Sequence, residues 1–104
     1  MRPPDDFLSY MVSDGHKVGG LIVEPGWFQL WPPNELDQFN LDYKVEEYLP
    51  GFLGFGSNGG GELLAFGEGG KIFMIPFIGM SSDDAKLVAG SWVEFVSLIE
   101  RRAE

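Results

Sequence analysis

The sequence contains no cysteine and only one histidine, His16. The absence of cysteine excludes disulfides, thiolate zinc sites, iron–sulfur clusters and a cysteine nucleophile. No apolar run approaches the roughly 18 residues that a membrane-spanning helix needs. The first residues, Met1-Arg-Pro-Pro-Asp-Asp, also lack the apolar core of a signal peptide. We therefore expect a soluble, cytoplasmic protein.

Basic residues are scarce, with 7 Lys and Arg against 16 Asp and Glu and a net charge of −9. Such a field repels phosphate backbones and anionic lipids, so neither nucleic acid nor a membrane is an expected partner. A chain of 104 residues, 44% of them hydrophobic, has the size and the apolar content of one globular domain. We expect a single domain over residues 1–104.

Short apolar runs separated by Gly and Pro predict a mixed fold. Residues 40–50 show no clean period and are expected to form an irregular surface connection. The turn at Pro25-Gly26 should be of type I or II, with proline in the second position. The expected elements are helices over 4–12 and 33–39, strands over 20–24, 27–31, 51–57, 62–66 and 71–77, and a terminal helix over 91–102.

The glycine-rich connections after residues 57 and 66 are too short for a crossover helix, so these strands should form an antiparallel meander. Apolar residues occur on both strand faces, and each face needs a cover. The best-supported cover is the terminal helix, which Ser91 and Glu94 open as a capping box. Arg101 and Arg102 suit the negative end of its dipole. The predicted fold class is α+β, an antiparallel β-sheet meander with helices packed on it, including a C-terminal helix.

Residues Gly54–Gly59 spell G-x-G-x-x-G, the dinucleotide-binding fingerprint. That motif binds pyrophosphate between a strand and a helix, whereas here a second strand is expected to follow. We interpret the run as a hairpin turn.

The remaining candidates for chemistry are weak. His16 lies in a predicted polar loop with no nucleophile elbow to activate. Asp83 and Asp84 are expected to form a turn, and the three tryptophans are expected in the core. The sequence thus predicts no enzyme and no catalytic, cofactor-binding or metal-binding residue.

Acidic residues gather in the middle of the chain, where Lys44 is the only base between Asn34 and Glu68. Such a stretch serves solubility in most proteins, but a protein that binds basic partners carries the same pattern. Both interpretations remain open. The candidate partner-binding residues are Glu35, Asp37, Asp42, Glu46 and Glu47.

Several motifs together resemble the SUKH superfamily, the family of the fungal cell-wall assembly regulators. They include Leu30-Trp31-Pro32-Pro33-Asn34-Glu35-Leu36, the run from Gly51 to Glu62, the segment from Met74 to Ser81, and Ser91 to Phe95. The resemblance spans nearly the whole chain. It implies structural roles for its motif positions: Trp31, Pro32, Gly51, Phe52, Gly56, Gly59, Phe66 and Pro76.

The resemblance also implies an α+β fold and, for bacterial members, a role as immunity proteins that neutralise secreted toxins, often nucleases, by direct binding. The expected partner is therefore a basic toxin domain. A regulatory or scaffold domain with an endogenous partner, or a small ligand-binding domain, remains an alternative. Family members usually carry a further helix before the segment that begins at Pro4. Its absence here would leave room for a homodimer or for a larger exposed apolar patch.

Overall fold

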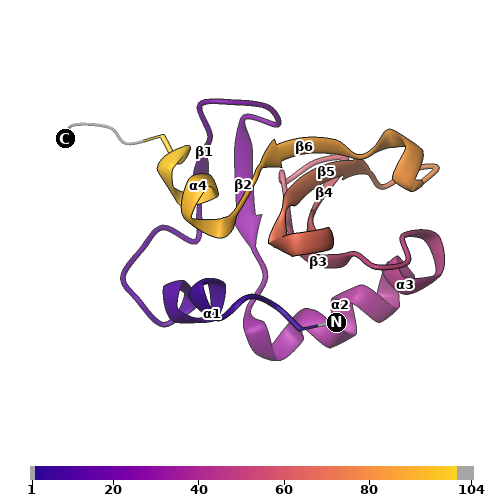
Figure 1. Ribbon diagram of the computed structural model, residues 1–104, viewed down its shortest axis with the longest axis horizontal. Coiled ribbons are helices and arrows are strands. Elements are labelled where there is room, and N and C mark those ends of the chain that lie inside the picture. The colour runs from indigo at the N-terminus through magenta and orange to yellow at the C-terminus, as the bar shows by residue number, and fades with distance from the viewer. Residues whose placement is uncertain (1, 101–104) are drawn as a thin grey trace.

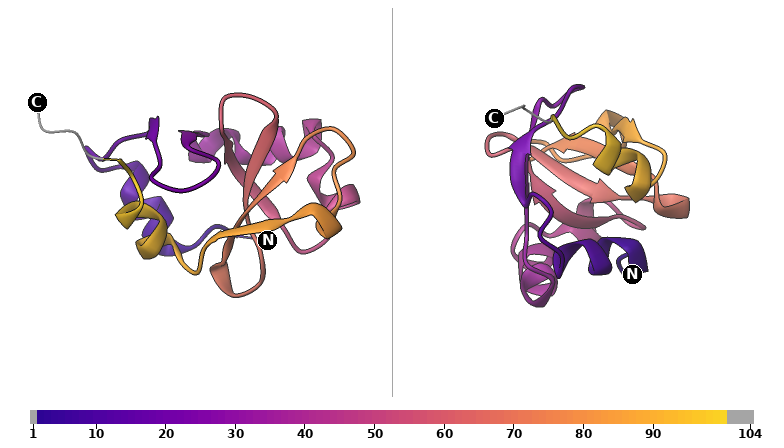
Figure 2. Two further views of the ribbon diagram at one scale, coloured as in Figure 1. Left: turned by 90° about the horizontal axis from the view of Figure 1, so that it is seen from above. Right: turned by 90° about the vertical axis from the view of Figure 1, so that its left-hand side faces the viewer.

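The computed structural model describes residues 2–100 and contains one six-stranded antiparallel sheet (Figure 1). The strands pair in the order of the sequence, so each strand neighbours the one before it. Figure 2 shows that the sheet is strongly curled. The strands are β1 (Val18–Gly20), β2 (Trp27–Leu30), β3 (Leu53–Ser57), β4 (Glu62–Phe66), β5 (Ile72–Pro76) and β6 (Lys86–Ala89).

Four α-helices and three short 3₁₀ helices accompany the sheet within residues 2–100. Helix α1 packs on α4, α4 on β6, and α2 and α3 on β3 (Figures 1 and 2). The α+β class, the meander and the C-terminal helix are confirmed. The helices are α1 (Asp5–Met11), α2 (Leu36–Asp42), α3 (Val45–Tyr48) and α4 (Trp92–Ser97), with η1 (Pro33–Glu35), η2 (Glu68–Gly70) and η3 (Ser82–Asp84).

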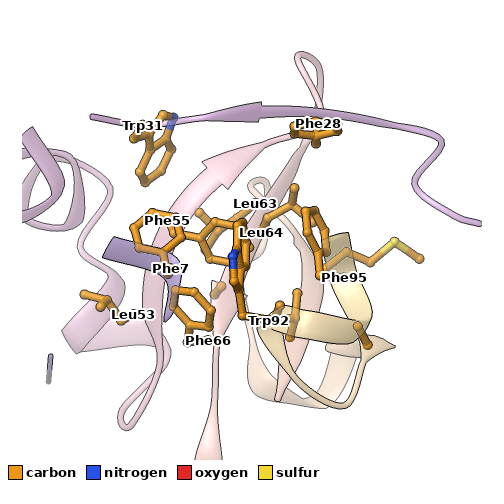
Figure 3. Close-up of a cluster of buried hydrophobic side chains, with 14 of the residues drawn as sticks. Phe7, Phe28, Trp31, Leu53, Phe55, Leu63, Leu64, Phe66, Trp92 and Phe95 are labelled. Atoms are coloured by element: carbon orange, nitrogen blue, oxygen red, sulfur yellow. The ribbon is translucent and has the colours of Figure 1, made fainter. Parts of the chain in front are cut away.

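Aromatic side chains from α1, α4 and the sheet meet in the core (Figure 3). The Phe7 ring lies 5.6 Å from Phe55, 5.4 Å from Phe66 and 5.0 Å from Trp92, each in an edge-to-face arrangement. Such pairs contribute roughly 0.5–1.5 kcal/mol beyond the apolar area they bury. One short helix at each end of the described chain is thus held on the sheet by the same cluster.

Strand β3 shows why the sheet needs helices on two sides. Side chains alternate along a strand, and Phe55 points into the cluster with Phe7. A Cβ on the preceding residue, Gly54, would instead meet Trp31 and Asn40. Because Asn40 belongs to α2, α2 and α3 cover the side of β3 that α1 does not. The prediction that each face has its own cover is confirmed here.

Two motif glycines are required for different reasons. Gly59 has φ +76°, in the left-handed region that β-branched residues avoid. Gly56 lacks this conformation, but a Cβ there would collide with the backbone carbonyl oxygen of Gln29 on β2. Gly59 therefore serves the turn through its positive φ, whereas Gly56 allows β2 and β3 to approach closely.

The prediction of an irregular connection over residues 40–50 was wrong. Helix α2 continues to Asp42, and α3 follows after Lys44, whose φ of 56° is left-handed. Each helix is short enough that its period is hard to see. Their buried residues, Leu36, Val45 and Leu49, hold them on the sheet, because helices of one or two turns are not stable alone.

The first hairpin also differs from its prediction. Strand β1 begins at Val18 rather than residue 20, and residues 21–26 form the connection. The amide of Gly26 donates to the carbonyl of Val23 at 2.8 Å, and the Glu24–Pro25 bond is cis. Pro25 is therefore the third residue of this turn, not the second as types I and II would require.

The terminal helix begins where predicted and ends earlier. The Ser91 hydroxyl accepts from the amide of Glu94 at 3.1 Å, and the Glu94 carboxylate accepts from the amide of Gly90. Helix α4 ends at Ser97, and the chain beyond Leu98 pairs with the end of the first hairpin strand: Ile99 forms an antiparallel bridge with Leu21, and the amide of Glu100 donates to the carbonyl of Gly20 at 2.8 Å. Arg101 and Arg102 lie outside the described residues. Strand β6 was not predicted.

Candidate functional site

The candidate surface consists of η1, α2 and α3, which together connect β2 to β3. Pro33 begins η1, in a position where its fixed φ suits a helical turn and its missing amide costs no bond. Leu36 and Val45 then turn inward. Ten of the other helical positions are exposed, and five of these ten carry acids.

All five predicted partner-binding carboxylates lie on this surface, and all are exposed. Glu35 is in η1, Asp37 and Asp42 are on α2, and Glu46 and Glu47 are on α3. None of them forms an ion pair within residues 2–100. We call Glu35, Asp37, Asp42, Glu46 and Glu47 the acidic surface.

Asn40 joins α2 to the sheet. Its Oδ1 accepts from the amide of Gly54 at 2.8 Å, and its Nδ2 donates to the carbonyls of Gly54 at 2.9 Å and Leu36 at 2.7 Å. The register of β3 against β4 shifts between Gly54 and Gly56, so these bonds serve backbone groups at an irregular place in the ladder. The contact fixes the acidic surface relative to β3.

A groove of about 380 Å³ opens beside this contact. It brings together Asp37 and Glu46 of the acidic surface, while Glu35, Asp42 and Glu47 lie outside it. Sequence reasoning missed the apolar part of the lining, because Leu53 was assigned only to a strand and Phe52 only to a strand and a structural motif position. The lining residues are Asp37, Asn40, Leu41, Glu46, Phe52 and Leu53.

Large apolar side chains are exposed next to the acids. Leu41 is 72% exposed, and Tyr43 and Tyr48 are also exposed. The Tyr43 ring packs against Phe77 at 4.7 Å, and these two tyrosines line a second groove of about 260 Å³ with Phe77, Gly79 and Met80. Clustered aromatic residues on a charged surface are typical of protein-binding sites. Sequence analysis had no signal for this cluster beyond the presence of tyrosine among the acids.

The motif residues that the resemblance marked as structural lie at the following places in the fold. Trp31 and Phe66 are buried, and Gly51 has φ +86° in the turn before β3. Pro32 is the residue before η1, and Pro76 ends β5 opposite Glu62. Phe52 is half-buried and packs edge-to-face on Phe73 at 5.5 Å.

The other segments and residues singled out in the sequence lie where they were expected, except Trp27. The G-x-G-x-x-G run connects β3 to β4 as a hairpin, and Asp83 donates its amide to the Ser81 hydroxyl in a turn at η3. The expectation that all tryptophans are core residues was wrong for Trp27, which is 46% exposed on β2. His16 is exposed in the loop before β1.

The described part of the chain shows neither a membrane-spanning helix nor a cluster of metal-binding side chains. Residues 2–100 contain no helix long and apolar enough to cross a membrane. The same residues contain no group of three His, Cys, Asp or Glu side chains placed to hold a metal ion.

Comparison with known families identifies the class of protein. The family model described as SMI1/KNR4 (SUKH-1) matches residues 2–98. The chain therefore belongs to the SMI1/KNR4 family, and the resemblance noted in the sequence is confirmed. Among curated proteins, none matches the chain.

Proposed function

We propose that this protein is a non-enzymatic binding module and that it acts as an immunity protein for a basic toxin domain. The observation that carries the proposal is the acidic surface, whose five exposed carboxylates form no ion pair within residues 2–100 and lie beside exposed Leu41, Tyr43 and Tyr48. Exposed apolar groups supply the area that a partner buries, and the carboxylates supply attraction and orientation.

Occlusion requires no chemistry from this chain. A toxin that binds nucleic acid carries a basic surface, and an acidic protein that covers it blocks substrate by competing for the same charges. The toxin itself comes from the family resemblance, while the acidic surface and its apolar side chains come from this chain.

The experiment has two arms. The chain is first used to capture the product of the adjacent gene, and that product is then expressed in cells with and without the chain. The proposal expects a stable complex and restored growth. Capture without protection would favour the regulatory or scaffold alternative, and a small molecule bound to the purified protein would favour the ligand-binding alternative.

A further inference from the structure

The groove beside Asn40 has an apolar lining with few available polar groups. Leu53 is buried and Phe52 half-buried, while Leu41 is largely exposed at its side. The amide of Asn40 is already engaged by three backbone bonds. The polar side chains left to meet a ligand are the carboxylates of Asp37 and Glu46.

These two carboxylates reach the groove from different helices. Asp37 lies in the first turn of α2, and Glu46 in the first turn of α3. Neither side chain accepts a hydrogen bond or pairs with a cation within residues 2–100, whereas Asp42 accepts from the Gln38 amide at 2.8 Å. Two unengaged acceptors therefore flank an apolar lining.

We propose that this groove binds an arginine side chain of the basic partner. The inference rests on the proposed function and specifies how the acidic surface recognises its partner. A guanidinium offers five donors in one plane, so it can bond two carboxylates at once, and its aliphatic stem packs on apolar surface.

Lysine fits the groove less well than arginine. An ammonium is a compact, strongly hydrated charge without the flat face that packs on an aromatic ring such as Phe52. The volume of about 380 Å³ lies near the lower end of the roughly 300–1,000 Å³ found for small-molecule sites. That size suits one long side chain, and the net charge of −9 attracts a cation.

The test uses three acetylated and amidated tripeptides, Gly-Arg-Gly, Gly-Lys-Gly and Gly-citrulline-Gly, with the full chain. Backbone amide spectra are recorded by NMR at about 50 mM salt, where surface charges are little screened. We expect saturable shifts at Leu41, Phe52 and Leu53 with the arginine peptide. The lysine peptide should bind several-fold more weakly, and the uncharged citrulline peptide should cause no saturable shift.

Matched variants separate the groove from general attraction. Asp37→Asn and Glu46→Gln should each weaken arginine-peptide binding about tenfold, because each removes charge-assisted hydrogen bonds. Glu47→Gln removes the same charge next to Glu46 but outside the groove, and its affinity should stay within twofold. Leu41→Ser tests the apolar lining at a position whose exposure leaves the fold little affected, and it should also weaken binding.

Two results would overturn the inference: no saturable shift at these positions, or equal weakening by Glu47→Gln and Glu46→Gln. The partner provides a separate check. If the Asp37→Asn and Glu46→Gln variants lose peptide binding yet still neutralise the toxin fully, the partner does not use the groove; this result also overturns the inference, while the proposed function stands. If the peptide binds as expected but no partner is neutralised, the immunity role is wrong, and the groove remains a site for arginine.

Discussion

Truncation of Trp92 gives the sharpest test of how the fold is held together. This residue on α4 is only 3% exposed. Its indole lies beside Phe7 and Phe95 (Figure 3), with ring centroids 5.0 Å and 5.1 Å away, and 5.3 Å from the ring of Tyr10. Trp92 therefore contacts α1 and its own helix, and at 5.7 Å it also meets Phe55 of β3.

Trp92→Ala should lower the free energy of unfolding by roughly 3–5 kcal/mol, since it leaves a cavity among these rings. Domains have only about 5–15 kcal/mol in total, so the melting temperature should fall by roughly 15 °C or more. Thermal and urea unfolding followed by circular dichroism measure both quantities. The control is Val93→Ala, a neighbour that is 68% exposed and should change stability by less than about 0.5 kcal/mol.

Trp92→Phe separates packing from hydrogen bonding. The buried indole Nε1 has no hydrogen-bond partner within residues 2–100, so phenylalanine removes area but no bond. We expect the free energy of unfolding to fall by about 1–2 kcal/mol, a smaller loss than the one expected for alanine. The packing argument fails if Trp92→Ala melts within a few degrees of the wild type, or if phenylalanine is as damaging as alanine.

Three further predictions concern the turns and the site. Gly56→Val and Gly59→Val should each lower the melting temperature, and for Gly59→Val backbone strain should lower the free energy of unfolding by roughly 1–3 kcal/mol. A variant that melts like the wild type but loses a nucleotide ligand would instead restore the dinucleotide interpretation. Asn40→Ala should cost about 1–3 kcal/mol in urea unfolding, because it leaves the backbone groups of Gly54 unpaired, and unchanged stability would contradict the role of this contact. His16→Ala should leave toxin neutralisation and melting intact, and lost neutralisation at unchanged melting would demand an active role for this loop.

The sequence predicted best where contacts between residues close in sequence decide the structure. Ser91 and Glu94 placed the start of α4 correctly because side chains that cap a helix act over three residues. The glycine-rich turns after β3 and β4 were predicted for a similar reason, since short connections leave only antiparallel pairing.

Prediction failed where tertiary contacts decide the structure. Residues 36–48 form two helices whose break, at Lys44, has a backbone conformation that no local signal marks. Strand β6 is four residues long and exists because it pairs with β5. Helix α4 is followed by residues that pair with Gly20 and Leu21, some eighty positions earlier, a contact that no local signal could reveal.

The candidate site, like the fold, could be predicted from the sequence only in part. Composition alone predicted the exposure of Glu35, Asp37, Asp42, Glu46 and Glu47, because carboxylates without partners stay in water. Composition could not predict which of them share a groove. The shared groove forms where Asn40 contacts Gly54, fourteen positions later in the sequence. This contact joins α2 to β3, and Phe52 and Leu53 lie there beside Asp37 and Glu46.

The central claim is that a basic protein binds the acidic surface, and the association rate constant with the captured partner tests it most directly. Between about 50 and 500 mM salt the Debye length falls below about 5 Å, so the wild-type rate should drop several-fold or more. The double variant Glu46→Lys, Glu47→Lys should associate slowly even at low salt while melting like the wild type, because exposed charges contribute little to folding. A rate that neither salt nor these reversals change would contradict the account.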